Sequence, residues 1–140
     1  MTMDQKITIP LINQISEIER LSNIVNEFGE RHSVSSEAMF AMNLALEEIL
    51  INVIKHGYTD EDAHEIEVRL LFDNGEMVVE VEDDGIAFNP LEAPTPDITK
   101  PLEERPIGGL GIHLTRTMMD RTAYKRQGNK NILLMAKKAG

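Results

Sequence analysis

Residues 48–57 of the chain read EILINVIKHG. Three polar side chains, Glu48, Asn52 and His56, recur there at intervals of four residues within a stretch that is otherwise apolar except for Lys55. Residues four apart project from the same face of an α-helix, one turn above the other. The stretch therefore predicts a largely apolar helix that presents a carboxylate, an amide and an imidazole in one line and ends at Gly57.

Two helices are predicted in the first half of the chain. The first covers residues 16–30, where apolar side chains recur at helical spacing. The second contains the opening stretch and begins after a serine N-cap at Ser35 or Ser36. The apolar positions of the first helix are Ile18, Leu21, Ile24 or Val25, and Phe28. Those of the second include Met42, Leu46, Ile49 and Val53.

Alternating apolar and polar residues predict the strands. One hairpin pairs residues 65–72 with 77–82 across an Asn74-Gly75 turn, and a second pairs 122–127 with 131–138 across a turn at 128–129. Residues 6–10 indicate a short edge strand that stops at Pro10. This order predicts an α+β fold, a two-layer sandwich whose mixed, mostly antiparallel sheet is covered on one face by helices, in a single domain spanning residues 1–140.

Asp83 is the unusual residue of the first hairpin. Side chains alternate between the two faces of a strand, so Asp83 falls on the apolar face of Met77 and Val81. A carboxylate there could accept a hydrogen bond from the exocyclic amine of adenine, which guanine lacks at that position, while Gly85 would let the chain turn beside the base. The pair Asp84-Gly85 also fits an ordinary turn after a strand.

A proline-rich segment follows. Five of the six prolines lie between Pro90 and Pro106, which predicts an irregular loop at about residues 89–107 and a third helix at about 110–119. Loops of this length inside compact domains are often lids over functional sites. In such a lid, Lys100 and Arg105 could reach a phosphate group.

Three glycines, Gly108, Gly109 and Gly111, stand at the start of the third predicted helix. Glycines let backbone amides approach phosphate oxygens, and a helix N-terminus favours negative charge. The same residues would also serve as a hinge that ends the proline-rich loop. Either role is compatible with the sequence.

Composition sets limits on function. The chain has 140 residues, 41% of them hydrophobic, and a formal net charge of −10. The absence of cysteine excludes a disulfide framework and a thiolate metal site, and the acidic charge disfavours direct nucleic-acid binding. The longest apolar stretch, residues 38–54, contains four polar residues, and the first nine residues lack a signal-peptide core. We expect a cytoplasmic protein that does not enter a membrane.

The spacing of Glu48 and Asn52 suits a magnesium site. Mg²⁺ prefers oxygen ligands and is often held by few protein groups together with substrate phosphates. Asn52 could supply an amide oxygen, and Glu48 could polarise a hydroxyl that attacks the terminal phosphate. The same two residues also fit a solvated stripe on a surface helix, and Glu47 lacks the four-residue relation to Asn52. His56 could contact phosphates or simply cap the helix C-terminus.

Together these motifs resemble the ATP-binding domain shared by gyrase, the Hsp90 chaperones, histidine kinases and MutL. Within that group, the chain resembles most the small bacterial anti-sigma factors that are also serine-protein kinases. The likeness covers almost the whole chain. Residues 48–58 are similar to the N-box, residues 83–87 to the first glycine box, residues 108–112 to the second, and residues 98–105 to the lid before it.

The resemblance implies the Bergerat, or histidine-kinase-like, ATPase fold and assigns roles to matching residues. Glu48 would be the general base, Asn52 the magnesium ligand and Asp83 the adenine-reading residue, while Arg20 falls where such proteins dock partners. The other nucleotide-binding residues it implies are His56, Gly85, Ala87, Thr99, Lys100, Arg105, Gly108, Gly109, Leu110, Gly111 and Ile112.

The activity implied by the resemblance is ATP- and Mg²⁺-dependent phosphorylation of a serine on a small anti-anti-sigma protein with a STAS domain. The same chain could sequester a sigma factor, so that partner exchange switches transcription, and members of the family often form homodimers. One alternative is a non-catalytic ATP-binding module that sequesters a sigma factor or another regulator. Another is a degenerate domain that binds no nucleotide.

Two positions depart from the pattern of many relatives. Ala87 stands where the first glycine box often has a second glycine. In the last hairpin, residues 128–131 read GNKN in place of the Gly-Thr pair of the third box. The first departure would leave the backbone near the base less free.

Overall fold

The computed structural model describes residues 6–92 and 115–140. In chain order the elements are β1 (Lys6–Ile12), α1 (Glu17–Arg31), α2 (Ser36–His56), β2 (Glu65–Asp73), β3 (Glu76–Asp83), the short 3-10 helix η1 (Pro90–Glu92), β4 (Arg121–Gln127) and β5 (Lys130–Lys138). Residues 115–118 are also helical, at the end of the predicted third helix. The rest of that helix and of the predicted lid lies outside the described residues.

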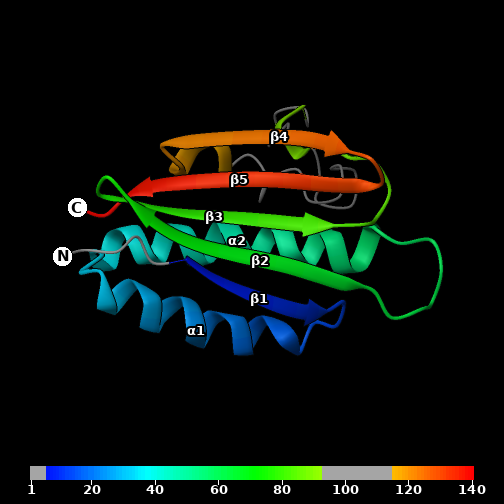
Figure 1. Ribbon diagram of the computed structural model, residues 1–140, viewed down its shortest axis with the longest axis horizontal. Helices are drawn as coiled ribbons and strands as arrows, with labels where there is room; N and C mark the ends of the chain where they lie inside the picture. The colour runs from blue at the N-terminus through cyan, green and yellow to red at the C-terminus, as the bar shows by residue number, and fades with distance from the viewer. Residues whose placement is uncertain (1–5, 93–114) are drawn as a thin grey trace, which may run out of the picture.

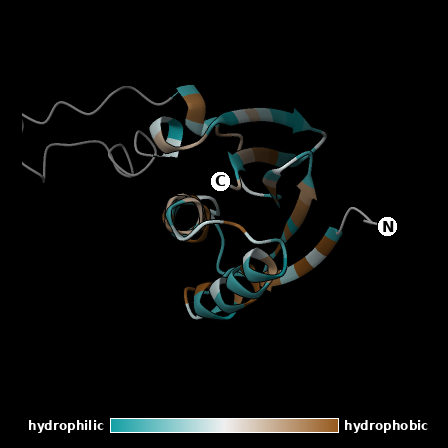
Figure 2. Cartoon of the chain, turned by 90° about the vertical axis from the view of Figure 1, so that its left-hand side faces the viewer, coloured by the Kyte–Doolittle hydropathy of each residue, from teal (hydrophilic) through white to brown (hydrophobic). Residues whose placement is uncertain are grey.

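The five strands form one sheet in the order β1-β2-β3-β5-β4, and each neighbouring pair is antiparallel. Helices α1 and α2 both lie on one side of this sheet (Figure 1). Figure 2, turned to look along α2, shows the sheet curving around that helix. The prediction of an α+β two-layer sandwich with helices on one face is therefore confirmed, and the described strand pairs are all antiparallel.

The turns and helix ends lie where short local patterns in the sequence predicted them. Asn74 and Gly75 have φ angles of 52° and 76°, the left-handed region that a two-residue hairpin turn requires. Gly128 has a φ of 61° in the second hairpin. At the start of α2, the Ser35 side chain accepts a hydrogen bond of 3.1 Å from the amide of Ala38. These predicted boundaries hold to within one or two residues.

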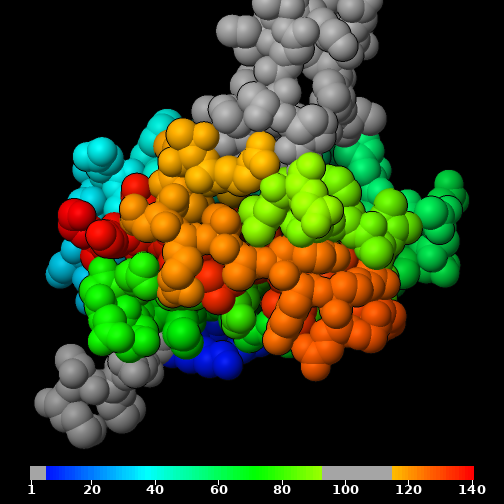
Figure 3. Space-filling model, turned by 90° about the horizontal axis from the view of Figure 1, so that it is seen from above, coloured from blue at the N-terminus to red at the C-terminus, as the bar shows by residue number. Residues whose placement is uncertain are grey.

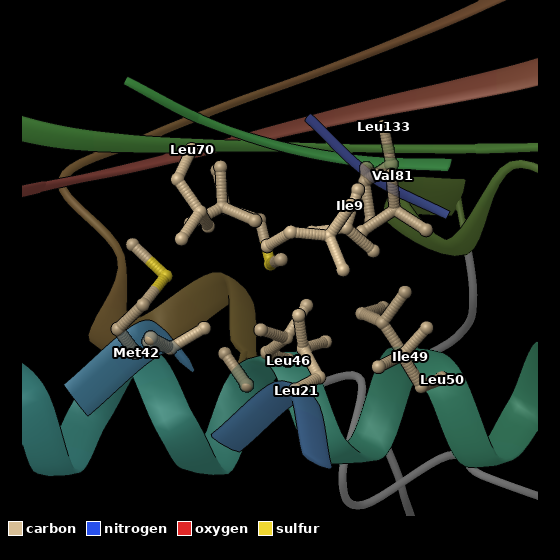
Figure 4. Close-up of a cluster of buried hydrophobic side chains, with 14 of the residues drawn as sticks. Ile9, Leu21, Met42, Leu46, Ile49, Leu50, Leu70, Val81 and Leu133 are labelled. Carbon is tan, nitrogen blue, oxygen red and sulfur yellow. The ribbon is translucent and has the colours of Figure 1, made fainter. Parts of the chain in front are cut away.

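The core lies between the helices and the sheet. Side chains from β1, β2, β3 and β5 point toward side chains from α1 and α2 (Figure 4). On α1 it is Val25, rather than Ile24, that is fully buried. The labelled core residues are Ile9, Leu21, Met42, Leu46, Ile49, Leu50, Leu70, Val81 and Leu133.

The predicted stop at Pro10 is wrong, because β1 continues to Ile12. Among the described strands, β1 lies at the edge of the sheet and pairs with β2 alone, where Pro10 stands opposite Glu67. The Pro10 carbonyl accepts a hydrogen bond of 2.8 Å from Arg20 of α1, so the backbone polar groups of this residue are not needed by β2. A proline without an amide hydrogen is tolerated on such an edge.

The described helices do not include a membrane span. None of them is both long enough and apolar enough to cross a bilayer. The longest, α2, runs for 21 residues and carries Glu47, Glu48 and Lys55.

Candidate functional site

A cavity of about 260 Å³ opens beside the C-terminal half of α2 and the ends of β3 and β5. Its volume is near the lower end of the range for small-molecule sites, roughly 300–1,000 Å³. Its walls are mostly apolar, with a few polar groups that converge on them. The described residues that line it are Ile49, Asn52, Val53, His56, Gly57, Val81, Asp83, Ile86, Phe88, Pro90, Tyr124, Asn131 and Leu133.

Asp83 is the carboxylate on this wall. It is only 6% exposed, at the end of β3 and on the inward face that the alternation of the strand predicted. Its Oδ1 accepts hydrogen bonds from the amide of Gly85 at 2.9 Å and from Nδ2 of Asn131 at 3.0 Å. No described residue donates to Oδ2, so Asp83 has an acceptor left for a ligand in the cavity.

Burial raises the pKa of the Asp83 carboxyl above its ordinary value. The hydrogen bonds from Asn131 and Gly85 act against that rise, and so does the nearby positive charge of Arg126. These groups therefore help to keep Asp83 ionised, in the form that only accepts hydrogen bonds.

Asn131 was not predicted as a site residue, yet it organises this end of the cavity. Its Nδ2 donates to Asp83 and, over 2.8 Å, to the carbonyl of Ile86, while its Oδ1 accepts from the amide of Phe88 and the hydroxyl of Tyr124. These four bonds use the whole capacity of an amide side chain. Asn131 therefore positions Asp83 and the segment after it and has nothing left for a ligand.

A signal for Asn131 was present in the sequence. It shares its strand face with Leu133 and Met135, so its side chain points inward although it is polar. The same reasoning had identified Asp83. Asp83 and Asn131 are direct partners in the β3–β5 register, which a single sequence does not reveal.

The Asp-Gly segment is held against the end of α2. The amide of Ile86 donates to the carbonyl of Gly57 over 2.8 Å. A Cβ atom on Gly85 would lie 2.4 Å from that carbonyl oxygen. Position 85 therefore requires a glycine because the Gly57 backbone lies too close to leave room for a side chain. The prediction had assigned the small size of Gly85 to the space beside a base.

Asn52 lines the cavity and is half-buried. Its Nδ2 is buried and has no hydrogen-bond partner in the part of the chain that the structure describes. A buried polar group without a protein partner usually has another partner in the functional state. This amino group is free to donate a hydrogen bond to a ligand in the cavity, and the role of the Asn52 amide oxygen as a cation ligand stays a prediction.

The other two polar residues of the opening stretch differ in position. His56 is exposed and lines the cavity, and no described residue hydrogen-bonds to its side chain. Glu48 is half-buried, one turn before Asn52, and is not among the described residues that line the cavity. Glu47 is exposed and borders a different, smaller hollow between α1 and α2.

Two more predicted residues can be placed. Ala87 is exposed and does not line the cavity. Arg20 on α1 donates to Glu17 and to the Pro10 carbonyl, each over 2.8 Å, and its side chain remains 48% exposed. Arg20 does not line the cavity, and its side chain is accessible to a partner. In the space-filling view, the yellow-green segment between β3 and η1 lies beside β4, which is orange (Figure 3).

Eight predicted site residues lie outside the described part of the chain. They are Thr99, Lys100, Arg105, Gly108, Gly109, Leu110, Gly111 and Ile112. The described part also holds no group of three or more histidine and carboxylate side chains arranged to bind a metal. A cation here would rest on the Asn52 amide and on oxygens supplied by the ligand, as Mg²⁺ commonly does.

Comparison with known proteins gives a consistent result. The family described as histidine kinase-like ATPase domain matches residues 13–137. The serine-protein kinase RsbW of Listeria monocytogenes serotype 4a is 32% identical over 125 residues, which cover 85% of this chain and 78% of that protein. The serine/threonine-protein kinase BtrW of Bordetella bronchiseptica is 28% identical over 101 residues, which cover 72% of this chain and 71% of the relative.

A solved structure shares the fold. The crystal structure of the RsbU and RsbW domains of Rv1364c from Mycobacterium tuberculosis matches 96% of this chain with a TM-score of 0.66 and 12% sequence identity. The match covers 32% of that longer chain. At this level of identity the likeness supports the fold and says nothing further about activity.

Proposed function

The chain belongs to the family of histidine kinase-like ATPase domains, and we propose that it binds ATP with Mg²⁺ and transfers the terminal phosphate to a serine of a protein partner. The observation that supports this most is the cavity whose wall carries both the Asp83 carboxylate and the Asn52 amide of α2. Asp83 is a buried acceptor, and the buried Nδ2 of Asn52 has no hydrogen-bond partner among the described residues.

Asp83 would recognise the base. Its free carboxylate oxygen would accept a hydrogen bond from the exocyclic amine of adenine, whereas the carbonyl oxygen of guanine would be repelled at the same position. The apolar walls around it, including Ile49 and Leu133, would contact the faces of the purine. Asn131 and Gly85 would hold the carboxylate in place.

Asn52 would hold the cation at the phosphate end. A bound Mg²⁺ would neutralise negative charge on the phosphate oxygens. His56, one turn later and on the cavity wall, would contact phosphate oxygens from the same helix face. The glycines at 108–111 and the lid residues Lys100 and Arg105 remain proposed phosphate contacts.

Glu48 would act as the general base. Its carboxylate would take the proton from the serine hydroxyl as the serine oxygen attacks the terminal phosphorus, and ADP would leave. Glu48 makes no hydrogen bond or ion pair with another described residue, so no described group competes for its carboxylate.

The proposed partner is a small anti-anti-sigma protein with a STAS domain, and a sigma factor is a second partner that would compete with it. The relatives named as serine-protein kinases support this proposal. Homodimer formation and a cytoplasmic location belong to the same proposal. Arg20 is the proposed docking residue, and its exposed side chain is compatible with that role.

A second candidate is a non-catalytic ATP-binding module that sequesters a sigma factor or another regulator. The observation that favours it is the position of Glu48, which is absent from the described wall of the cavity. In this case ATP would only favour the conformation that binds it better.

Labelled ATP separates these functions. The purified chain is incubated with γ-labelled ATP, Mg²⁺ and a serine-containing STAS-domain protein that co-purifies with it. Transfer of label to the partner supports the kinase. ATP-dependent partner binding without transfer supports the regulatory module. Absence of any thermal stabilisation by ATP and Mg²⁺ contradicts both, because a ligand that binds the native state raises its stability.

A further inference from the structure

His64 lies directly before β2, outside the cavity, and its imidazole ring is held between two carboxylates. Nε2 is 2.7 Å from Oδ1 of Asp60, and Nδ1 is 3.3 Å from both carboxylate oxygens of Asp84. The backbone of His64 is fixed by two hydrogen bonds with Asn13, at 2.9 and 3.0 Å. These contacts fix the ring next to Asp84, in the turn that follows β3.

The geometry selects the charged form of His64. An ionised carboxylate accepts hydrogen bonds and cannot donate one, so both ring nitrogens must carry a proton to satisfy Asp60 and Asp84. In agreement, the hydrogen bond to Asp60 raises the pKa of His64, burial acts against the rise, and the hydrogen bond to Asp84 adds to it.

The remaining groups near the His64 ring are one aromatic side chain and the residues on either side of Asp84. Tyr58 stacks on the ring, with centroids 4.2 Å apart and planes at 14°. Burial raises the pKa of Tyr58, so the phenol stays neutral and adds no charge. Beyond Asp84 lie Asp83 and the cation Arg126, which donates to the Gly85 carbonyl over 2.9 Å. The charges facing His64 are thus the two carboxylates, Asp60 and Asp84.

Asp84 connects this cluster to the cavity. It follows Asp83, whose carboxylate lines the cavity, and precedes Gly85, whose amide donates to Asp83. Oδ1 of Asp84 is buried and has no hydrogen-bond partner among the described residues, so the ion pair with His64 compensates its charge. Without that compensation, the turn would hold two adjacent buried or half-buried negative charges.

We propose that His64 is a positioning residue for the nucleotide cavity, and that loss of its proton releases Asp84, loosens the turn at residues 83–86 and weakens nucleotide binding. This inference rests on the proposed ATP site. It adds a dependence on pH that comes from a residue that does not touch the ligand.

The sign of the effect follows from the raised pKa. Because the pKa of His64 is raised above its ordinary value of 6.5, the ring keeps its proton, and Asp84 its charged partner, up to and beyond that pH, and both are lost as the pH rises through the higher value. Nucleotide affinity should therefore fall on the alkaline side of 6.5.

The test is calorimetric titration with the non-hydrolysable analogue AMP-PNP and Mg²⁺ between about pH 6 and pH 9, the range in which histidine titrates. The affinity of the wild type is divided by that of His64→Gln at each pH, which cancels the titration of the phosphates. We expect the ratio to fall by roughly tenfold, equivalent to a difference of about one pKa unit between free and bound protein. A ratio that does not change with pH overturns the proposal.

Two further variants exclude a merely structural role. Asp60→Asn should move the midpoint of the fall to lower pH, because it removes the hydrogen bond that raises the pKa of His64 most. His56→Gln, which changes the histidine on the cavity wall, should keep the midpoint whatever its effect on the absolute affinity. A midpoint that moves with His56 and not with Asp60 contradicts the proposal.

The nucleotide-free protein gives an independent readout. In NMR titrations, the amides of Gly85 and Ile86 should shift with the same midpoint as the His64 ring, and Asp84→Asn should remove this coupling. If no nucleotide binds at any pH, the proposed function fails, while the coupled titration still supports the positioning role. A ring that titrates without shifting these amides overturns it.

Discussion

Asn131 on β5 donates a hydrogen bond of 3.0 Å to Oδ1 of Asp83, its direct register partner on β3. Both side chains are 6% exposed. The bond joins two inward-facing polar residues at the end of adjacent strands, where apolar residues would otherwise continue the core. It fixes the direction of the carboxylate and leaves its second oxygen without a described donor.

Replacement of Asn131 by alanine should weaken ATP binding. It removes a hydrogen bond to a charged, buried carboxylate, which costs about 1.5–3 kcal/mol of stability. Affinity should fall because the Asp83 carboxylate is no longer held in place for the ligand. Because Asn131 also lowers the pKa of Asp83, the affinity of the variant should fall further as the pH is lowered. Calorimetry at two pH values measures both effects.

Tyr124→Phe is the matched control for that experiment. It removes the hydroxyl bound to Asn131 Oδ1 but keeps the bond from Nδ2 to Asp83. Its effect on affinity should be smaller and should not grow at low pH. Equal losses in the two variants would show that the contact with Asp83 has no special role.

Asp83→Asn should raise the stability of the nucleotide-free protein and at the same time abolish ATP binding. A carboxyl whose pKa is raised by burial stabilises the fold in its protonated form, and this benefit is lost as the pH rises through its pKa in the folded protein. Neutral asparagine should therefore raise the melting temperature of the nucleotide-free protein at neutral pH. The stabilisation by ATP and Mg²⁺ should disappear.

The pH dependence is the check on this reasoning. The advantage of Asp83→Asn over the wild type should shrink as the pH is lowered through the pKa of Asp83, because the wild-type carboxyl becomes neutral too. Thermal denaturation with and without nucleotide provides the measurement. A variant that is less stable at neutral pH and still binds ATP would refute the assignment.

Gly85→Ala should destabilise the protein through a backbone clash. The new Cβ would lie 2.4 Å from the Gly57 carbonyl oxygen, which cannot move away as a flexible side chain could. Overpacking of this kind costs about 1–3 kcal/mol. Ala87→Gly, two residues on and exposed, should change stability by less than about 1 kcal/mol. Urea denaturation curves of both variants compare them directly, and equal stabilities would contradict the tight contact.

Glu48→Gln should abolish most phosphate transfer if the chain is a kinase. Loss of a general base typically costs about 10²–10⁴-fold in rate. Affinity for ATP should change little, because Glu48 is not on the described cavity wall. Glu47→Gln provides a neighbouring carboxylate of the same size and should transfer phosphate at close to the wild-type rate. A normal rate for Glu48→Gln would show that the base lies elsewhere.

Much of the fold could be predicted because its signals are local. The Asn74-Gly75 turn, the serine cap of α2 and the alternation along β3 each depend on residues within a few positions of one another. The same alternation placed Asp83 inward. The predicted end of β1 at Pro10 was wrong because a proline ends a strand only where its missing amide hydrogen is needed for pairing. Whether it is needed depends on which side of β1 faces the sheet edge, and residues 6–10 do not contain that information.

The parts of the site that were missed arise from contacts between distant segments. Asn131 meets Asp83 across 48 positions of the sequence, and Arg126 reaches Gly85 across 41. The need for Gly85 comes from Gly57 at the end of α2. Each residue was visible in the sequence, but its role depends on the strand register and on where the end of α2 meets the turn after β3.

The most direct measurement is a crystal structure of the protein with Mg²⁺ and a non-hydrolysable ATP analogue. Our account predicts that the adenine amine lies within hydrogen-bonding distance of Asp83 Oδ2, and that the Asn52 side chain faces the cation at the phosphates. A nucleotide bound elsewhere, or a base in this cavity with Asp83 and Asn52 turned away from the ligand, would contradict it.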